Sequence, residues 1–300
     1  MPDAFRNNLP KRFVENVIEV CGARGEKWLE NIPEILMQLS EMWEISVEAH
    51  FLDLSYNYAA PARMADGSSA VIKLALPSED LEIFSQAAYL RLLDGNGAVR
   101  LIAEDRPTRA ILIERALPGY DLKVLFAGDQ VQAVEVAIPA LKRIVRDPPD
   151  SGNLIKFADW YEKLRHIPSN AFPRQMANEA FCIFDESRLR RQLIHGDFHH
   201  TNILADGPDS FTVIDPKGVI GDIRYDIAVF LNNHQHWLRS GDKRREMQNA
   251  VLRFAEAFDL DPRSLERWAF AQLVLSSFWT FSEAGSGWRE RLGTADIWNV

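Results

Sequence analysis

The sequence predicts an α+β fold with two lobes: a small N-terminal lobe built on an antiparallel sheet with a helical extension, and a larger, mainly helical C-terminal lobe. Short alternating segments separated by turn residues occupy the region from 45 to 114, and helical spacing dominates after 117. A chain of 300 residues can bury a core in each lobe, and ligands tend to bind in the cleft between two lobes. We place the boundary after 114, which gives lobes of residues 1–114 and 115–300.

The elements of the first lobe follow from spacing and breaker residues. Apolar residues recur at helical spacing from 11 to 40, with expected breaks at Gly22 and Gly25. Alternation in the segment AVIKLAL, residues 70–76, indicates a strand at the end of a strand-rich region. The expected elements are a helical region at 11–40, strands within 45–76, a helix at 80–93 ended by DGNG, and strands at 99–103 and 110–114.

The second lobe reads as helices around one hairpin. The hairpin runs from Asn202 to Asp215 through the turn residues DGPD at 206–209. We expect the aromatic residues Trp237, Phe254, Trp268 and Trp279 to lie in the core. The expected helices are 130–146, interrupted by Pro139, then 153–164, 175–184, 227–234, 242–258, and a last one with Asp261 as its N-cap and Pro262 in its first turn.

Composition limits the classes of partner that the protein can bind and the cellular compartment in which we expect it. The net charge of −9 argues against nucleic acid as a partner and is compatible with a cationic small molecule. Cys21 and Cys182 show no metal-type spacing, so we expect buried free thiols in a reducing compartment rather than a disulfide. The start of the chain lacks the apolar core of a signal peptide, and the most apolar helix candidate, 268–282, is too short to span a membrane. We therefore expect a cytoplasmic protein without a membrane partner.

The chemistry is indicated by LIHGDFHHTN, residues 193–202, followed by VIDPKG at 213–218. A phosphoryl-transfer site needs an aspartate to accept the proton of the attacking hydroxyl, and an asparagine and a second aspartate to hold magnesium; here these are Asp197, Asn202 and Asp215. Carboxylate and amide oxygens suit this hard cation. The first motif alone is short enough to be an ordinary polar loop, but the hairpin would bring Asn202 and Asp215 together.

These residues, with GD and YD after DPKG and with ILIERALPG upstream, resemble the aminoglycoside and hydroxyurea resistance kinases, most closely the streptomycin 6-phosphotransferase branch. The resemblance extends over roughly residues 10–290. It implies a protein-kinase-like fold, with a nucleotide-binding first lobe and a catalytic, substrate-binding second lobe. It also implies ATP and Mg as cofactors and phosphoryl transfer to a hydroxyl of a small cyclic acceptor, with Asp197 as base and Asn202 and Asp215 as magnesium ligands.

The resemblance also assigns the nucleotide side. Lys73 fits the strand lysine that reaches the α and β phosphates. The helix position that normally holds its glutamate partner is Gln86, and Glu82, one turn earlier, is the alternative. No glycine motif covers the phosphates, so donors from Ser55 and Asn57 would do so. Adenine would bind backbone groups of the connection Ile113–Ala116, which leaves the side chains of Glu114 and Arg115 without a required role.

Five further polar residues have less certain roles. His195 is expected to brace the catalytic loop, and Asp226 to anchor it from the following helix. His199 and His200 with Asp197 could instead form a metal cluster, although neither zinc-type spacing is present. Lys217 could contact a phosphate oxygen or form a salt bridge to Asp222 or Asp197.

The acceptor is the least determined part of the site. A polycation of the streptomycin type calls for carboxylates around its pocket, and Asp222, Glu256, Glu283 and Glu290 are candidates. A metabolic sugar or amino-alcohol kinase is the alternative enzyme. A catalytically silent nucleotide-binding protein of the same fold is the alternative from another class.

Overall fold

A computed structural model describes residues 5–78, 82–150, 154–167, 172–234, 243–283 and 286–298. The chain forms two compact units, Met1–Ala116 and Leu117–Val300. Cys21 and Cys182 are both free thiols, but only Cys21 is buried; Cys182 is exposed on α8 (Arg174–Asp185), so its expected burial is wrong. No helix in these ranges combines the length and the apolar character required to cross a membrane.

The first unit contains a five-stranded antiparallel sheet in the order β1-β2-β3-β5-β4. The strands and helices of this unit are α2 (Lys11–Cys21), α3 (Ala23–Trp43), β1 (Ile45–Val47), β2 (Tyr58–Met64), β3 (Ser69–Leu74), α4 (Glu82–Leu93), β4 (Leu101–Asp105) and β5 (Ala110–Glu114). The predicted order of elements is confirmed here, although β4 begins two residues later than expected.

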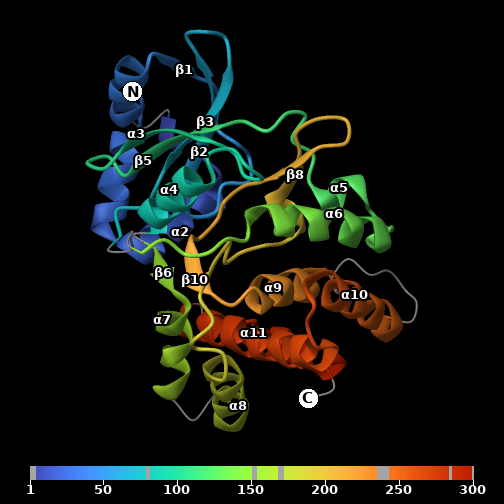
Figure 1. The fold of residues 1–300 in the computed structure, drawn as a ribbon. Coiled ribbons are helices and arrows are strands. Elements are labelled where there is room, and N and C mark those ends of the chain that lie inside the picture. The colour runs from blue at the N-terminus through green and yellow to red at the C-terminus, as the bar shows by residue number, and fades with distance from the viewer. Residues whose placement is uncertain are drawn as a thin grey trace. The chain divides into compact units, whose positions relative to one another are not determined.

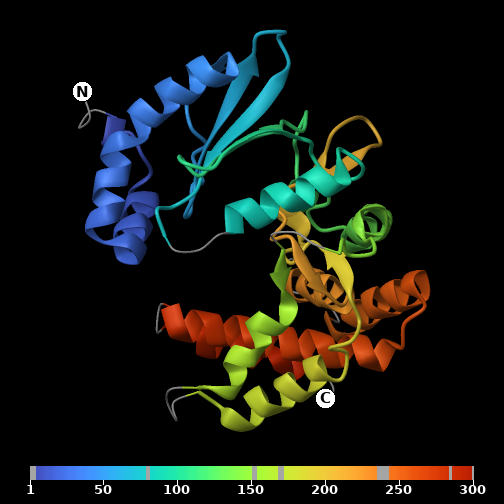
Figure 2. The same ribbon diagram turned by 60° about the vertical axis from the view of Figure 1, so that its left-hand side comes forward.

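Helices α2 and α3 share one core with a face of this sheet (Figures 1 and 2). The buried residues of this core include Phe13, Leu29 and Ile32 from the helices and Ile72 and Leu112 from the sheet. Helix α4 contacts β4 and β5. Because side chains alternate along a strand, Lys73 lies on the face opposite to Ile72, and it is buried there.

The expected break at Gly25 is wrong. The chain turns between helices at Gly22, whose φ is +54°, and α3 runs through Gly25. A Cβ on Gly25 would lie 2.6 Å from the carbonyl oxygen of Val17 in α2. This glycine therefore permits the two helices to pack closely, which spacing along the chain does not reveal.

The second unit is mainly helical, with a three-stranded sheet β6-β10-β7 and a hairpin β8-β9. Its helices are α5 (Leu122–Leu125), α6 (Gln130–Ile144), α7 (Phe157–Tyr161), α8 (Arg174–Asp185), α9 (Arg224–His234), α10 (Lys243–Phe258), α11 (Pro262–Glu283) and α12 (Trp288–Gly293). Its strands are β6 (Ile155–Lys156), β7 (Gln192–Ile194), β8 (Ile203–Ala205), β9 (Phe211–Val213) and β10 (Val219–Gly221). The 3₁₀ helices are η1 (Glu162–Arg165), η2 (His200–Asn202) and η3 (Thr294–Ile297).

Helix α11 is central to this unit and packs against α8, α9, α10 and α12; Figure 1 shows α9 and α11 side by side. The backbone amide of Ser264 donates to Asp261 at 3.0 Å, which confirms the expected N-cap of α11. Phe254 and Trp268 are buried as expected, but Trp279 is only half-buried, so its assignment to the core is wrong. Trp237 lies outside the described residues.

Two predicted helices differ in the structure. Helix α6 continues through Pro139 instead of being interrupted there. The expected helix at 153–164 is replaced by β6, α7 and η1, because Ile155 and Lys156 pair in parallel with β10. Pairing with a distant strand has outweighed the local helical spacing.

Candidate active site

The loop between β7 and η2 is fixed by one buried carboxylate. The backbone amides of His195 and Gly196 donate to Asp226 Oδ2 and Oδ1, each at 2.7 Å. Asp226 lies in the first turn of α9 and is fully buried. Burial and the nearby charge of Asp197 raise the pKa of Asp226 to about 7, against the two amide hydrogen bonds that lower it. These contacts agree with the anchoring role predicted for this residue.

His195 braces the same loop in its neutral form. Its Nε2 lies 2.9 Å from the carbonyl oxygen of Ile214, so Nε2 carries the proton and donates. The amide of Asp197 donates to Nδ1 at 3.1 Å, so Nδ1 is unprotonated. Burial lowers the pKa of His195 to about 4, which agrees with this tautomer. Both nitrogens are therefore occupied by backbone groups, as expected of a structural histidine.

Gly196 is required by the tight packing of the loop. Its φ is +83°, and a Cβ there would lie 2.6 Å from Val219 Cγ2 and 3.0 Å from Lys217 Cβ. It would also lie 3.1 Å from the edge of the Trp160 indole. The residue before Asp197 is thus enclosed on three sides, which fixes where the Asp197 side chain begins.

Asp197 is ionised and still reachable. Its side chain is 36% exposed, and its Oδ1 lies 3.5 Å from Nε2 of His199. Burial acts to raise the pKa of Asp197, but neighbouring polar and charged groups, Lys217 among them, outweigh it and hold the pKa below its ordinary value. A carboxylate of this kind can accept a hydrogen bond from a hydroxyl group at any pH near neutrality.

Asn202 presents its carboxamide oxygen without a partner. Its Nδ2 donates to the carbonyl oxygen of Asp197 at 2.9 Å and lies 3.2 Å from Nε2 of His199. Neither of these contacts involves Oδ1, and we find no other partner for Oδ1 among the described residues. This arrangement suits a cation ligand, because an amide oxygen can coordinate a hard cation while its nitrogen is held by protein groups.

The hairpin brings Asn202 and Asp215 to the same end of β8 and β9. Ile203 pairs with Val213, and the amide of Ile214 donates to the carbonyl oxygen of Asn202 at 3.0 Å. Asp215 follows directly and has a φ of +57°, a left-handed conformation that is uncommon for a residue other than glycine. The hairpin has the predicted form. One amide oxygen and the Asp215 carboxylate are hard donors of the kind that Mg²⁺ requires, so the residues fit this ion.

The alternative metal cluster of Asp197, His199 and His200 is not formed. His200 is buried, with its Nε2 3.1 Å from Nδ1 of His234 and its ring stacked on Phe230. Within the described part of the chain no three His, Cys, Asp or Glu side chains are grouped as a metal site. His199, in contrast, stays beside Asp197 and Asn202.

In the first unit, the residues assigned to the nucleotide have different surroundings. Lys73 is buried on β3, and Gln86 is buried on α4. The Asn57 side-chain oxygen accepts from the amide of Leu76 at 3.3 Å, and the Ser55 carbonyl accepts from Asn16, so both residues also hold the loop itself. After Ile113, the amides of Glu114 and Arg115 donate to Arg100 and Ser69.

The amide of Ala116 is the next donor along this connection. No hydrogen bond from it is found among the described residues. Backbone donors that are left over at the end of a strand can bind a ligand, so this amide is free to serve a nucleotide base.

The prediction that Asp222 offers its carboxylate to the acceptor is wrong. Asp222 is almost fully buried and forms a two-pronged ion pair with Arg224, with N–O distances of 3.0 and 2.6 Å. Its oxygens are therefore occupied within the fold. Glu256 and Glu290 are exposed on α10 and α12, and the side chain of Glu283 lies outside the described residues.

The structure adds two aromatic residues that the sequence did not single out as a pair. Trp160 lies close enough to Gly196 that a Cβ there would meet its ring at 3.1 Å, and the ring makes an edge-to-face contact with Trp279, with ring centroids 5.4 Å apart. Both are half-buried. Their helical spacing along α7 and α11 is the same as that of core residues, so no local signal distinguishes them.

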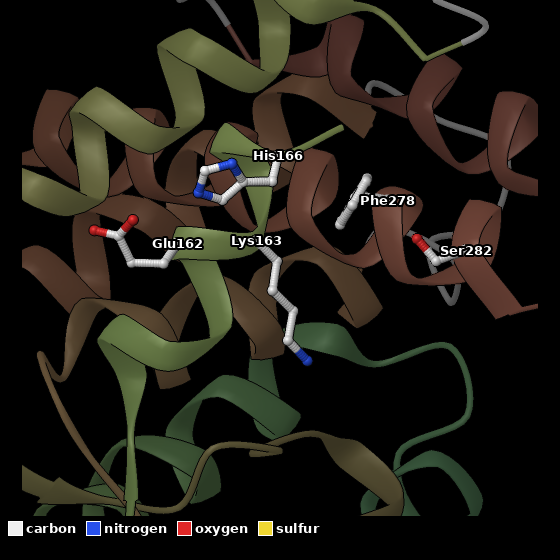
Figure 3. Close-up of a pocket in the computed structure, with 5 residues that line it drawn as sticks. All are labelled: Glu162, Lys163, His166, Phe278 and Ser282. Atoms are coloured by element: carbon white, nitrogen blue, oxygen red, sulfur yellow. The ribbon is translucent and has the colours of Figure 1, made fainter. Parts of the chain in front are cut away.

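A cavity of about 400 Å³ in the same unit is lined by Glu162, Lys163, His166, Phe278 and Ser282. Figure 3 shows Lys163 and His166 on one side and Phe278 and Ser282 on the other, with the Glu162 carboxylate pointing away from Phe278. Phe278 is the sequence neighbour of Trp279, so one wall of the cavity belongs to the same helix, α11, as one of the two indoles.

The two-unit fold, with an antiparallel sheet followed by a mainly helical unit that carries this loop, defines a phosphotransferase of the protein-kinase-like class. The model of the aminoglycoside/hydroxyurea antibiotic resistance kinases matches residues 43–285, and the chain belongs to this family. It is therefore a member of a small-molecule kinase family, as the sequence resemblance implied.

Two curated relatives extend over nearly the whole chain. Streptomycin 6-kinase of Streptomyces griseus is 24% identical over an alignment of 293 residues, and the match covers 92% of this chain and 92% of the relative. Hydroxyurea phosphotransferase of Kitasatospora aureofaciens is 27% identical over an alignment of 295 residues, and the match covers 94% of this chain and 83% of the relative.

Solved structures share the fold. A choline/ethanolamine kinase family protein from Mesorhizobium loti has a TM-score of 0.65 at 11% identity and covers 89% of this chain and 95% of its own. An amicoumacin kinase in complex with AMP-PNP and Ca²⁺ has a TM-score of 0.62 at 15% identity and covers 89% and 92%. At these identities the likeness concerns the fold.

Proposed function

We propose that this chain transfers the terminal phosphoryl group of ATP, with Mg²⁺, to a hydroxyl group of a small cyclic acceptor of the streptomycin type. The observation that carries the proposal is the arrangement on one loop of an ionised Asp197 and an Asn202 whose carboxamide oxygen has no partner among the described residues. Family membership and the two curated relatives support the reaction type.

In this proposal Asp197 orients the acceptor hydroxyl. A lowered pKa makes the carboxylate a weak base, so it holds the hydroxyl by a hydrogen bond and accepts the proton late, as P–O bond formation raises the acidity of that hydroxyl. Asn202 and Asp215 hold the cation, which when bound offsets the charge of the phosphates. Most of the acceleration comes from positioning and electrostatics.

The first unit supplies the nucleotide contacts in this proposal. Lys73 binds the α and β phosphates, with Gln86 or Glu82 supporting it on α4. The backbone of Ile113–Ala116, with the Ala116 amide, binds the adenine. Ser55 and Asn57 keep the loop over the phosphates in shape, and their remaining donors face the nucleotide. We place the reaction in the cytoplasm, where ATP and reduced thiols are present.

The acceptor is proposed to bind against Trp160 and Trp279. A guanidinium or ammonium group, as in streptomycin-type compounds, is attracted to an indole face, an interaction worth about 0.5–2 kcal/mol. Trp160 lies close to Gly196, the loop residue before Asp197, so an acceptor on these rings would lie near the proposed base. The cavity lined by Phe278, the sequence neighbour of Trp279, gives room for a distal part of a large acceptor.

A metabolic sugar or amino-alcohol kinase is the second candidate, and specific observations favour it. Lys163 and His166 line the cavity, Asp222 is engaged by Arg224, and neither feature attracts a polycation. An acceptor with one positive charge or none would suit such a pocket.

An acceptor screen tests the proposal. Purified protein is incubated with ATP and Mg²⁺ and with streptomycin, hydroxyurea, choline-like amino alcohols and a panel of sugars, and phosphorylated product is detected by mass spectrometry. Product with streptomycin supports the first candidate, and product with a sugar or amino alcohol alone supports the second. ATP-dependent thermal stabilisation without any phosphorylated product would contradict both and indicate a catalytically silent nucleotide-binding protein.

A further inference from the structure

Three side chains form a hydrogen-bonded chain next to the proposed base. Thr201 Oγ1 lies 3.0 Å from His199 Nδ1, and His199 Nε2 lies 3.2 Å from Asn202 Nδ2. Asn202 Nδ2 in turn donates to the Asp197 carbonyl oxygen at 2.9 Å. Among the described residues, His199 is the one side chain found in contact with the carboxamide of Asn202.

The donor and acceptor of each of these hydrogen bonds follow from the last acceptor in the series, the carbonyl oxygen of Asp197. A carbonyl oxygen only accepts, so the Asn202 atom beside Asp197 is the nitrogen, and its second hydrogen points to His199 Nε2. Nε2 therefore accepts and carries no proton. The proton of a neutral imidazole is then on Nδ1, which donates to the Thr201 hydroxyl. Each of these donors has an acceptor.

Because both hydrogens of Asn202 Nδ2 are used within the loop, the carboxamide oxygen Oδ1 is the atom left to bind a ligand. Turning the amide over would place Oδ1 against the Asp197 carbonyl oxygen, so two acceptors would face each other. We propose that His199 is a positioning residue, which holds the Asn202 carboxamide with its oxygen directed at the divalent cation, while Thr201 fixes the tautomer of His199. The inference rests on the proposed function, in which Asn202 is a cation ligand.

A competing contact defines the alternative role. His199 Nε2 also lies 3.5 Å from Asp197 Oδ1, too far for a strong hydrogen bond. A proton on Nε2 could serve Asp197 only if Asn202 gave up its contact, so His199 cannot serve both at once. If His199 acts on Asn202, its loss weakens cation binding; if it acts on Asp197, its loss slows turnover with cation binding unchanged.

Two conservative variants separate the ring nitrogens. In His199→Gln the side-chain oxygen reaches the place of Nε2 and can still accept from Asn202. In His199→Asn the shorter amide reaches only the place of Nδ1, beside Thr201. Their comparison with His199→Ala therefore tests the Asn202 contact itself, and not merely the presence of a polar group. Thr201→Val removes the partner of Nδ1 alone.

The experiment measures binding of Mn²⁺ to the protein saturated with AMP-PNP, by electron paramagnetic resonance, so that no turnover is needed. We expect His199→Ala and His199→Asn to raise the Kd for Mn²⁺ about 10- to 100-fold, the range for residues that orient a metal ligand. His199→Gln should stay close to wild type, and Thr201→Val should have a smaller effect than His199→Ala. Melting temperatures without metal check that each variant is folded.

The control variants distinguish a failure of the proposed cation site from a failure of the role given to His199. Asn202→Ala and Asp215→Ala should weaken Mn²⁺ binding strongly; if neither does, the proposed function itself fails. If they do, but His199→Ala and His199→Asn bind Mn²⁺ as wild type does, His199 is not a positioning residue for Asn202. The same holds if His199→Gln is as impaired as His199→Ala. Lower kcat with unchanged Mn²⁺ affinity would assign His199 to Asp197 instead.

Discussion

The amide nitrogen of Gly196 lies 2.7 Å from Oδ1 of Asp226, a residue thirty positions later in the chain. The neighbouring amide of His195 takes the other oxygen of the same carboxylate at 2.7 Å. The first turn of α9 therefore fixes the backbone on which Asp197 stands, and the geometry of the proposed base depends on a residue that does not touch the reacting groups.

The first prediction concerns this anchor. In Asp226→Asn one carboxylate oxygen becomes an amino group that faces an amide donor, so one buried hydrogen bond is replaced by two opposed donors. We expect a loss of about 1–3 kcal/mol in the free energy of unfolding, the usual cost of a buried donor left without an acceptor. Urea denaturation gives this value, and kcat should fall as well. Wild-type stability and turnover would show that the carboxylate is dispensable.

The second prediction concerns Gly196. In Gly196→Ala the new methyl group meets Val219 and Lys217 in a left-handed backbone conformation, so the loop must shift. We expect a loss of stability of about 1–3 kcal/mol from overpacking, together with reduced turnover. Gly207→Ala in the β8–β9 turn is the matched control, because its nearest neighbour would be Ser210 Cβ at 3.5 Å, and it should stay within about 0.5 kcal/mol of wild type. Equal effects of the two variants would contradict this account of the loop.

The third prediction concerns acid stability. Burial lowers the pKa of His195 and of His234 to about 4, and that of His200 to about 2, from the ordinary value of 6.5. At these three histidines, between about pH 6.5 and 4, the unfolded chain binds more protons than the folded protein, so their contribution to stability falls as the pH is lowered. Asp226, whose pKa is raised to about 7, acts in the opposite direction, but one group opposes three, so we expect a net loss. Urea denaturation at pH 7.5 and 5.5 should show this loss.

A variant of His234 measures how much of this loss of stability comes from the buried pair of His200 and His234. His234→Asn cannot be protonated and can still accept from His200, so it should lose less stability than wild type between the two pH values. His166→Asn replaces an exposed histidine and should keep the wild-type difference. A wild-type protein with the same stability at both pH values would contradict the assignment of neutral, buried imidazoles.

The fourth prediction concerns the acceptor. Trp279→Ala should raise KM for a cationic acceptor by about 2- to 30-fold, the range of one cation–π contact, and leave KM for ATP unchanged. Trp279→Phe keeps an aromatic face, so its KM for the acceptor should lie between those of wild type and Trp279→Ala. If both variants keep the wild-type KM for every acceptor that is turned over, the indole pair does not bind the acceptor.

Much of the fold could be predicted because local signals agreed with the packing. The Asp261 cap, the alternation around Lys73 and the turn between β8 and β9 each have a short-range cause. Gly25 and residues 155–156 were misread because their conformations depend on α2 and on β10, which lie elsewhere in the chain.

The site divides in the same way. One short motif region contains Asp197, Asn202, Asp215 and Asp226, so the sequence alone identified them as candidates. Their roles in the reaction remain proposals. Asp222 looked equally available, but its pairing with Arg224 and its burial arise from packing against α11. Trp160 and Trp279 come from helices about 120 residues apart, and only the tertiary structure makes them neighbours.

Turnover of Asp197→Asn tests the central claim most directly. Initial rates of phosphoryl transfer from ATP to the acceptor found in the screen are compared for wild type and the variant, with matched melting temperatures and nucleotide affinities. We predict that the variant keeps its fold and binds nucleotide, while kcat falls on the order of 10²-fold or more, the range for a lost general base. Wild-type turnover by this variant would contradict the role of Asp197 and the mechanism built on it.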